Sequence, residues 1–344
     1  MDSKVMRALK KNKLTAFTIS RLHVFVKPLT LDVKQAVDQV IDARGGKGSR
    51  RHLRSDITYC RFMYGTKPEE YVLFRMYEYK DFARWQFFGH QDQKACELTE
   101  NDRTQEDFFK DKYQCYQKFS KYYKRDVVCI RNESDMKRYQ ELARKHDKLI
   151  LKPFDGKKGM GVRIFDPVLE PVQYDKSFER EPIVVEEVMV QAEPLRSLHP
   201  ASINTVRALT VRKNNKTHVL YTIIRIGVGN SVVDNAGAGG ISADIDLDTG
   251  IICTVGYREN GETYVRHPDT GVIIPGMVIP RWRELLDMLD ELSKVVPGVN
   301  VIGWDMALTE RGWAVIEANN FPAMTAVQMC RGRGIRKELE AILN

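Results

Sequence analysis

The chain has 344 residues, of which 43% are hydrophobic and 29% are charged. This composition excludes an intrinsically disordered, collagen-like or coiled-coil protein, and the length predicts about two domains. No stretch approaches the run of roughly 20 apolar residues that a membrane-spanning helix needs, and the N-terminus lacks a secretory signal pattern. The six cysteines include no CxxC pair, so we expect free thiols and a cytoplasmic protein.

The positive charge is concentrated at the N-terminus. The whole chain carries 54 Lys/Arg and 46 Asp/Glu, a net charge of +8, whereas residues 1–54 hold thirteen Lys/Arg and four Asp, a surplus of +9. The remaining residues therefore sum to −1. This pattern predicts weak, salt-sensitive contact of residues 1–54 with an anionic membrane or polymer. The competing interpretation is a segment packed on the body of the protein with its lysines facing water.

The predicted elements change in character along the chain. Residues 31–43 have helical periodicity that Gly45 and Gly46 end, an aromatic-rich stretch follows, and residues 105–123 predict a further helix leading into a strand, DVVCI. A helix is expected near residues 133–146. After residue 148, short β-rich runs alternate with turns, and a second helix is expected near residues 281–294. The mixture predicts an α+β fold with antiparallel hairpins. We expect three regions: 1–104, basic and aromatic-rich; 105–190; and 191–344.

The segment LKPFDGKKGMGVRIF (151–165) is a candidate phosphate cradle. A strand carrying Lys152 enters a loop with Gly156, Gly159 and Gly161, and glycines let backbone N–H groups approach phosphate oxygens. Lys157 and Lys158 add positive charge. The segment lacks the Walker pattern, and a glycine-rich hairpin turn with surface lysines explains the residues equally well.

The segment VIGWDMALTERGWAVIEANN (301–320) predicts a hairpin with a candidate metal site. If TERG is the turn, facing residues have numbers that sum to 621 or 622, so Asp305 faces Ile316 or Glu317. Glu317 and Asn319 point to one side, because side chains alternate along a strand. Two carboxylates and an amide oxygen are ligands suited to Mg²⁺.

The segment IVVEEVMVQAE (183–193) predicts an apolar strand that ends in acidic residues. Such a strand could offer its backbone to an adenine and a carboxylate to the ribose. On its own, it is also consistent with a charged edge strand.

The order and spacing of these segments resemble the ATP-grasp superfamily, over about residues 105–325. The resemblance implies two α+β subdomains that grip ATP, preceded here by a helical, aromatic-rich region. It also implies Mg²⁺, for which Mn²⁺ can substitute, held by Asp305, Glu317 and Asn319. The Asp111-Lys112 pair looks like the site of a phosphate-binding lysine in that superfamily. The implied nucleotide contacts are Lys112, Lys152, Gly156, Lys158, Gly159, Gly161, Glu186, Glu187, Val188 and Glu193.

A narrower resemblance rests on HPASINTVRALTV (199–211), RIGVGNSVVDNAGAGGIS (225–242) and the aromatic segments PEEYVLFRMYEY and FFKDKY. These look like the sugar-transfer-associated, glutamate-ligase-like ATP-grasp branch. One position departs from the superfamily, because Gly303 stands where many of its amide ligases carry an arginine. We expect Arg207 and Arg225 to act in its place. Asn235, Gly239 and Gly240 are expected to contact substrate, with a glycine-rich surface loop as the alternative.

The resemblance implies an ATP-dependent carboxylate–amine ligase that forms an amide through an acyl phosphate. Its substrates would be ATP, a small-molecule or sugar-linked carboxylate and an amine, in polysaccharide or cell-surface biosynthesis. The alternatives are an ATP-grasp kinase that stops at a phosphorylated product, or a nucleotide-binding regulator without turnover. A nucleic-acid partner is not expected, because no known nucleic-acid motif accompanies the basic segment.

Overall fold

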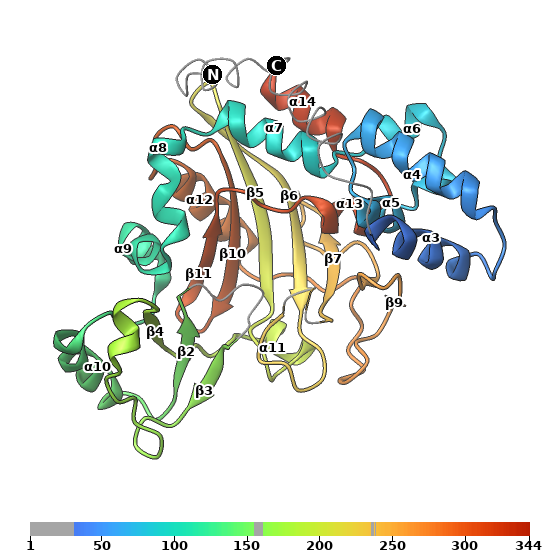
Figure 1. The fold of residues 1–344 in the computed structure, drawn as a ribbon. Helices are drawn as coiled ribbons and strands as arrows, with labels where there is room; N and C mark the ends of the chain where they lie inside the picture. Colours follow the sequence, from blue (N-terminus) through green and yellow to red (C-terminus); the bar gives the residue numbers. More distant parts are fainter. Residues whose placement is uncertain (1–30, 155–160, 235–236, 238) are drawn as a thin grey trace.

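The computed structural model describes residues 31–154, 161–234, 237 and 239–344, and Figure 1 shows how their elements are arranged. Two sheets with helices packed on them make up most of the fold. Among the described residues, every strand pairing is antiparallel, which confirms the predicted α+β class with antiparallel hairpins. Nowhere in these residues is a helix both long and apolar enough to cross a bilayer.

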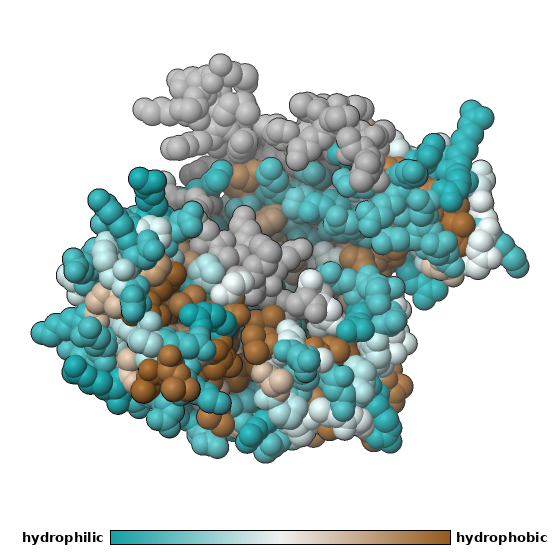
Figure 2. Space-filling model, turned by 60° about the horizontal axis from the view of Figure 1, so that its bottom comes forward, coloured by the Kyte–Doolittle hydropathy of each residue, from teal (hydrophilic) through white to brown (hydrophobic). Residues whose placement is uncertain are grey.

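The small sheet has the strand order β1-β4-β2-β3. Its strands are β1 (Val127–Ile130), β2 (Leu149–Pro153), β3 (Arg163–Phe165) and β4 (Ile183–Glu187). Helix α10 (Met136–Ala143) covers one face, where Tyr139 and Leu142 pack against Ile130, Leu149 and Val185. Figure 2 looks onto the end of the molecule that carries this sheet and shows apolar patches between hydrophilic ones. The sheet therefore has a core of its own.

The large sheet has the order β11-β10-β5-β6-β7-β8-β9. Its strands are β5 (Thr205–Lys213), β6 (Lys216–Ile226), β7 (Ile241–Ile245), β8 (Gly256–Tyr257), β9 (Thr263–Tyr264), β10 (Val301–Thr309) and β11 (Gly312–Asn319). Apolar residues of α12 (Trp282–Ser293) pack on one face. Residues of α7 (His90–Glu100), α13 (Thr325–Arg331) and α14 (Arg336–Leu343) join the core on the other face. The short helix α11 (Leu195–Leu198) precedes β5.

The first described helices form an N-terminal unit at the right of Figure 1. They are α3 (Leu31–Ala43), α4 (Arg50–Tyr64), α5 (Pro68–Leu73) and α6 (Asp81–Trp85). Residues from Val33 to Phe87 make a separate core, in which Ile57 and Tyr71 are buried. The predicted helix 31–43 is confirmed, and Gly45 and Gly46 follow it in the left-handed region that glycine favours.

Helix α9 (Lys112–Tyr123) lies between the two sheets. Its Phe119 is fully buried and stacks edge-on against Trp304 of β10, with ring centroids 5.2 Å apart. The single helix predicted over 105–123 is wrong, because α8 (Arg103–Glu106) and a 3₁₀ turn (Asp107–Lys110) precede α9. The Asp111 carboxylate accepts the backbone N–H groups of Tyr113 and Gln114, so it caps a new helix there. The predicted boundaries at 104 and 190 stay predictions.

Arg125 joins the two sheets. Its guanidinium donates to the carboxylate of Glu186 on β4 at 2.7 Å and to the backbone carbonyl of Val315 on β11 at 2.6 Å. The side chain of Arg125 is almost completely buried, so both ends of this link are shielded from water. A buried guanidinium is stable only when its donors are satisfied, and these contacts therefore fix the small sheet against β11.

This buried pair makes stability depend on pH in acid. Burial by itself raises the pKa of Glu186, but the positive charges of Arg125 and Lys152 outweigh it and hold the pKa at about 2, below the ordinary 4.5. The unfolded chain therefore takes up this proton first, and the free energy of unfolding falls as the pH drops from 4.5 toward 2. We expect Glu186 to account for roughly 3 kcal/mol of the loss.

Denaturant unfolding between about pH 5 and pH 3 checks this expectation. Glu186→Gln should be less stable than the wild type near neutral pH, because Arg125 loses its charged partner, and should lose less stability on acidification. Glu170→Gln is the matched control, since Glu170 pairs with Arg163 at an exposed position. The same pH slope in the wild type and in Glu186→Gln would contradict the assignment.

Candidate active site

The β10–β11 hairpin brings the predicted metal-binding residues together. Asp305 lies opposite Glu317, and Gly303 lies opposite Asn319. The predicted turn is confirmed by the pairing of Thr309 with Gly312. The strand pairing shifts by one residue between Asp305 and Met306. Both predicted sums of facing residue numbers therefore occur: 622 for Asp305 with Glu317, and 621 for Met306 with Val315. The two carboxylates are cross-strand neighbours on one face of the large sheet.

Asp305 is held between two arginines from neighbouring strands. Arg207 lies opposite it on β5 and makes a two-pronged ion pair, in which Nη2 is 2.7 Å from Oδ2 and Nε contacts Oδ1. Arg225 on β6 donates from Nη1 to the same Oδ2 at 3.0 Å. Burial alone raises the pKa of Asp305, but the two guanidinium groups outweigh it and hold the pKa at about 2. Asp305 is therefore ionised.

Arg225 is in turn positioned by Asp234. Its Nη2 lies 3.1 Å from Oδ1 of Asp234, whose other oxygen accepts the backbone N–H of Thr205 at 2.9 Å. All three side chains are buried. The sequence prediction missed Asp234, although the acid stands beside Asn235 in the segment that carries the narrower resemblance.

Glu317 differs from Asp305 in its environment. Its side chain is solvent-exposed, yet surrounding protein desolvates the carboxylate, and this raises its pKa together with the negative charge of Asp305. Arg207, Lys112 and Lys152 act in the opposite direction, which places all three within electrostatic range of Glu317. Two adjacent carboxylates and a nearby amide suit a hard divalent cation, because such an ion relieves their mutual repulsion. The residues therefore fit Mg²⁺.

The two lysines predicted to bind phosphate both have their side chains near the end of β2. Lys152 Nζ lies 2.8 Å from Oε2 of Glu186, and Lys112 Nζ donates to the carbonyl of Pro153 at 3.0 Å. Lys112 is the first residue of α9, and Lys152 lies on β2. The sequence prediction missed Arg125, the second partner of Glu186, because nothing in the motif pattern marks a basic residue just before a strand.

A sequence model of sugar-transfer-associated ATP-grasp proteins matches residues 93–344. The chain belongs to this family. Its fold is accordingly the ATP-grasp fold, and the small and large sheets stand for its two α+β parts. No curated protein sequence is significantly similar to the chain.

Solved structures of ATP-grasp ligases show distant similarity to this family member. D-alanine–D-alanine ligase from Helicobacter pylori is 12% identical, with a TM-score of 0.44 and 73% of this chain and 67% of that chain covered. N5-carboxyaminoimidazole ribonucleotide synthetase from Thermotoga maritima is 11% identical, with a TM-score of 0.41 and coverages of 74% and 56%. The ATP-grasp ligase PsnB, in complex with a precursor variant, Mg and ADP, is 11% identical, with a TM-score of 0.42 and coverages of 74% and 65%. The chain spans about half to two thirds of the length of these proteins.

The remaining predicted contacts lie in several places. Glu187 points away from Glu186, because neighbours on a strand face opposite sides, and its carboxylate pairs with Arg311 at 2.8 Å. Val188 is half-buried just after β4, and Glu193 is exposed. Gly156, Lys158, Gly159 and Asn235 lie outside the described residues. Gly161 is described, and at its positive φ of 73° a Cβ atom would lie 2.6 Å from the ring of Pro153. Gly239 accepts a hydrogen bond from Arg258 at 2.7 Å through its carbonyl, and Gly240 is buried.

A second group of metal-ligand side chains surrounds Glu187. Ligand atoms of Asp126, His146 and Glu187 lie within 4.8 Å of one another. Basic residues line the same pocket, namely Lys121, Lys124, Arg125, Lys145 and Arg311. Glu187 is already paired with Arg311 at 2.8 Å, and exposed acidic groups often cluster without an ion, so we assign no metal site there.

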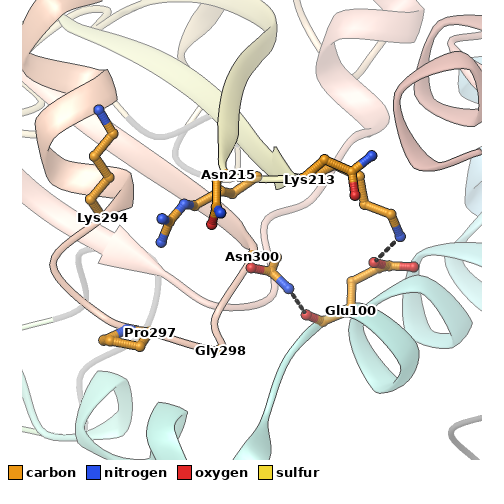
Figure 3. Close-up of a pocket in the computed structure, with 9 residues that line it drawn as sticks. Glu100, Lys213, Asn215, Lys294, Pro297, Gly298 and Asn300 are labelled. Atoms are coloured by element: carbon orange, nitrogen blue, oxygen red, sulfur yellow. Dashed lines mark hydrogen bonds and ion pairs between the residues drawn. The ribbon is translucent and has the colours of Figure 1, made fainter.

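A polar pocket lies at the far end of the large sheet (Figure 3). Lys213 reaches the carboxylate of Glu100 at 3.4 Å, and Lys294 pairs with Asp290 at 2.6 Å. Helices α7 and α12 both end beside this pocket, and cations are favoured at helix C-termini. Along β5, the pocket is about 20 Å from Arg207. Ion pairs and helix C-termini therefore account for the charged residues of this pocket, and we assign it no ligand.

The fold leaves no room for an arginine side chain at position 303 on β10. A Cβ atom at this position would lie 2.4 Å from the Cβ of Pro322, so no side chain fits. Gly303 and Asp305 face the same side of the sheet, because side chains alternate along a strand. Arg207, directly across from Asp305 on β5, brings a guanidinium to that carboxylate.

We expect Gly303→Ala to destabilise the fold by about 1–3 kcal/mol, because the added methyl group overpacks against Pro322. In a Pro322→Gly background the same substitution should cost at least about 1 kcal/mol less, since the clashing atom is gone. Chemical unfolding of the four proteins in this double-mutant cycle measures the difference. Equal costs in both backgrounds would show that the two residues do not restrict each other.

Proposed function

We propose that the chain is an ATP-dependent carboxylate–amine ligase that forms an amide through an acyl phosphate. The observation that carries the proposal is the convergence of Asp305, Glu317, two arginines and two lysines beside the junction of the sheets. Family membership supports ATP as the cosubstrate. The description of the family as sugar-transfer-associated supports a sugar-linked carboxylate or amine, and a role in polysaccharide or cell-surface biosynthesis.

In the proposed reaction, a substrate carboxylate oxygen attacks the γ-phosphorus of ATP, the bond to the leaving ADP breaks, and an acyl phosphate forms. An amine then attacks the carbonyl carbon, inorganic phosphate leaves with its bonding electrons, and the amine loses a proton. Lys112 and Lys152 would hold the phosphates, and Arg207 and Arg225 would hold the carboxylate and then the acyl phosphate. Residues 155–160 of the predicted phosphate cradle lie outside the described residues.

Asp305, Glu317 and Asn319 would hold Mg²⁺, which would neutralise charge that develops on the β- and γ-phosphates. The arginines do not separate a ligase from a kinase, because a planar guanidinium suits the oxygens of a phosphate as well as those of a carboxylate. We also retain as a proposal the weak contact of residues 1–54 with an anionic membrane or polymer. Residues 1–30 lie outside the described residues.

The reaction type is tested by product analysis. The chain is incubated with ATP, Mg²⁺ and panels of amino acids and uronic acids, and ADP release is followed together with the mass of the product. An amide with the release of phosphate supports the ligase. A stable phosphorylated product instead would identify a kinase, and no ADP release with any combination would favour a regulator.

Glu317→Gln keeps the shape of the side chain but removes one negative charge from the proposed cation site. Turnover should fall by at least about 100-fold, because even residues that only support metal ligands cost about 10- to 100-fold. Glu310→Gln in the turn of the same hairpin is the control, since Glu310 is exposed and lies away from Asp305. Steady-state ADP release measures both variants, and unfolding midpoints confirm that each is folded. Wild-type turnover in Glu317→Gln would remove Glu317 from the site.

Arg225→Lys keeps a positive charge but loses the planar fork that contacts Asp305 and Asp234 together. Nucleotide affinity should change less than about threefold, whereas amide formation should fall by about 100-fold or more. Arg283→Lys on the exposed surface of α12 is the control. Calorimetric ATP binding and amide yield separate the two effects. Collapse of ATP binding would place Arg225 with the phosphates and leave Arg207 as the residue that contacts the acyl phosphate.

A further inference from the structure

The N-terminal unit precedes the region that the family shares, which begins at residue 93. Figure 2 shows it projecting at the right of the molecule, with a largely hydrophilic surface. Its surface nevertheless carries large apolar side chains that its own core leaves outside. They are Tyr59, Phe62 and Met63 on α4 and Phe82 and Trp85 on α6, which we call the aromatic patch. The proposed ligase reaction uses none of them.

Helix α4 has two distinct faces. Leu53, Ile57, Cys60 and Tyr64 are buried against the rest of the unit. At 100° per residue, the opposite face carries Arg51, Ser55, Thr58 and Phe62 along one line, with Arg54 and Tyr59 beside it. Basic residues therefore occupy the first half of the exposed face and aromatic residues the second half. Arg51 and Phe62 are about 16 Å apart along the helix, and Arg54 and Tyr59 are about 8 Å apart.

Helix α6 extends the aromatic half. The ring of Trp85 lies 6.5 Å from that of Tyr64, which in turn lies 5.9 Å from the ring of Tyr59. Tyr59 and Trp85 thus contact the same buried ring, which places the exposed aromatic side chains of α4 and α6 next to each other. Phe82 is 83% exposed and thus protrudes from the surface rather than lining a groove. Protruding rings suit a surface that yields around them better than a small ligand, which needs a concave site.

The charge is positive toward the start of α4, whereas Asp81, an exposed acid next to Phe82, accepts a hydrogen bond from Tyr64. Arg44, Lys47, Arg51 and Arg54 are exposed between the end of α3 and the middle of α4. Two of the nearby acids are already matched, since Asp38 pairs with Arg50 and Asp56 pairs with Arg84. The described residues 31–54 hold six Lys/Arg and three Asp, a surplus of +3. The complementary surface is extended and anionic.

We propose that the aromatic patch and the exposed arginines of α4 dock the chain on a bilayer surface that contains anionic lipid. Tyrosine, tryptophan and phenylalanine side chains partition into the interfacial layer of a bilayer, while arginines remain at the level of the anionic headgroups. The inference deepens the proposed contact of residues 1–54 by naming the lipid surface and the residues that meet it. It does not depend on the ligase reaction.

Co-sedimentation of the full chain with vesicles tests the proposal. Vesicles of phosphatidylcholine alone are compared with vesicles that contain about 30% phosphatidylglycerol, at low and at high salt. We expect binding to the anionic vesicles at low salt, weaker binding at high salt and little binding to the neutral vesicles. No binding to anionic vesicles at low salt overturns the proposal, and equal binding to neutral vesicles removes the role of the arginines.

Two double variants separate the apolar and charged contributions. Phe62→Ser with Phe82→Ser should weaken vesicle binding about tenfold or more. Arg51→Gln with Arg54→Gln should weaken it about 25-fold at low salt, at about fivefold for each charge near an anionic surface. All four side chains are exposed, so we expect the unfolding midpoint and the turnover without vesicles to be unchanged.

Matched controls come from the other end of the molecule. Val168→Ser with Leu169→Ser removes two apolar side chains that are each 79% exposed, and Arg283→Gln removes an exposed charge on α12. Neither should alter vesicle binding by more than about twofold. An equal loss in the Val168/Leu169 control would show that binding is non-specific. If sedimentation velocity shows a dimer that Phe62→Ser with Phe82→Ser abolishes, the patch is instead an interface between copies of the chain.

Discussion

A buried carboxylate must be neutralised, and the site of this protein is arranged around that requirement at Asp305. Arg207 and Arg225 reach it from two strands, and Asp234 holds the second arginine. Removing one partner of such a buried pair leaves an uncompensated charge and costs about 3–5 kcal/mol. The order β10-β5-β6 is therefore what lets both arginines reach one carboxylate. A cation arriving at Asp305 would compete with these guanidinium groups and would leave them available for an anionic substrate.

A second buried charge connects this site to the small sheet. Glu186 is shared by Lys152 and Arg125, and Arg125 also donates to the backbone of β11. The proposed phosphate lysine is thus fixed, through one carboxylate and one guanidinium, to the strand that carries Glu317. Helix α9 strengthens the same junction, because it places Lys112 at its start and packs Phe119 on Trp304. The two halves of the site are held together by polar contacts in an apolar surrounding.

Much of this arrangement is predictable from local patterns. The pairing of Asp305 with Glu317 follows from the turn at Thr309–Gly312 and the alternation of side chains, and the α+β class follows from the β-rich runs. Contacts between distant segments are not predictable in this way. Arg125 stands in no recognisable motif, and it gains its partners Glu186 and Val315 only where strands far apart in the sequence meet. Asp234 lies in the segment of the narrower resemblance, but its contacts with Arg225 and Thr205 appear only in the folded sheet. The orientation of Glu187 likewise depends on Arg311, which is 124 residues away. The single predicted helix over 105–123 is wrong because the Asp111 cap outweighs its periodicity.

The β10–β11 hairpin contacts different parts of the molecule at its two ends. Asp305, Glu317 and Asn319 lie toward its open end. Arg311 in its turn forms an ion pair with Glu187 of the small sheet, and the Arg311 carbonyl accepts a hydrogen bond from Lys124 at the end of α9. The two ends are about 20 Å apart and are joined by paired strands. The hairpin therefore has one end in the candidate active site and the other end in contact with the small sheet. The candidate metal-binding residues and a contact with the small sheet therefore belong to one continuous hairpin.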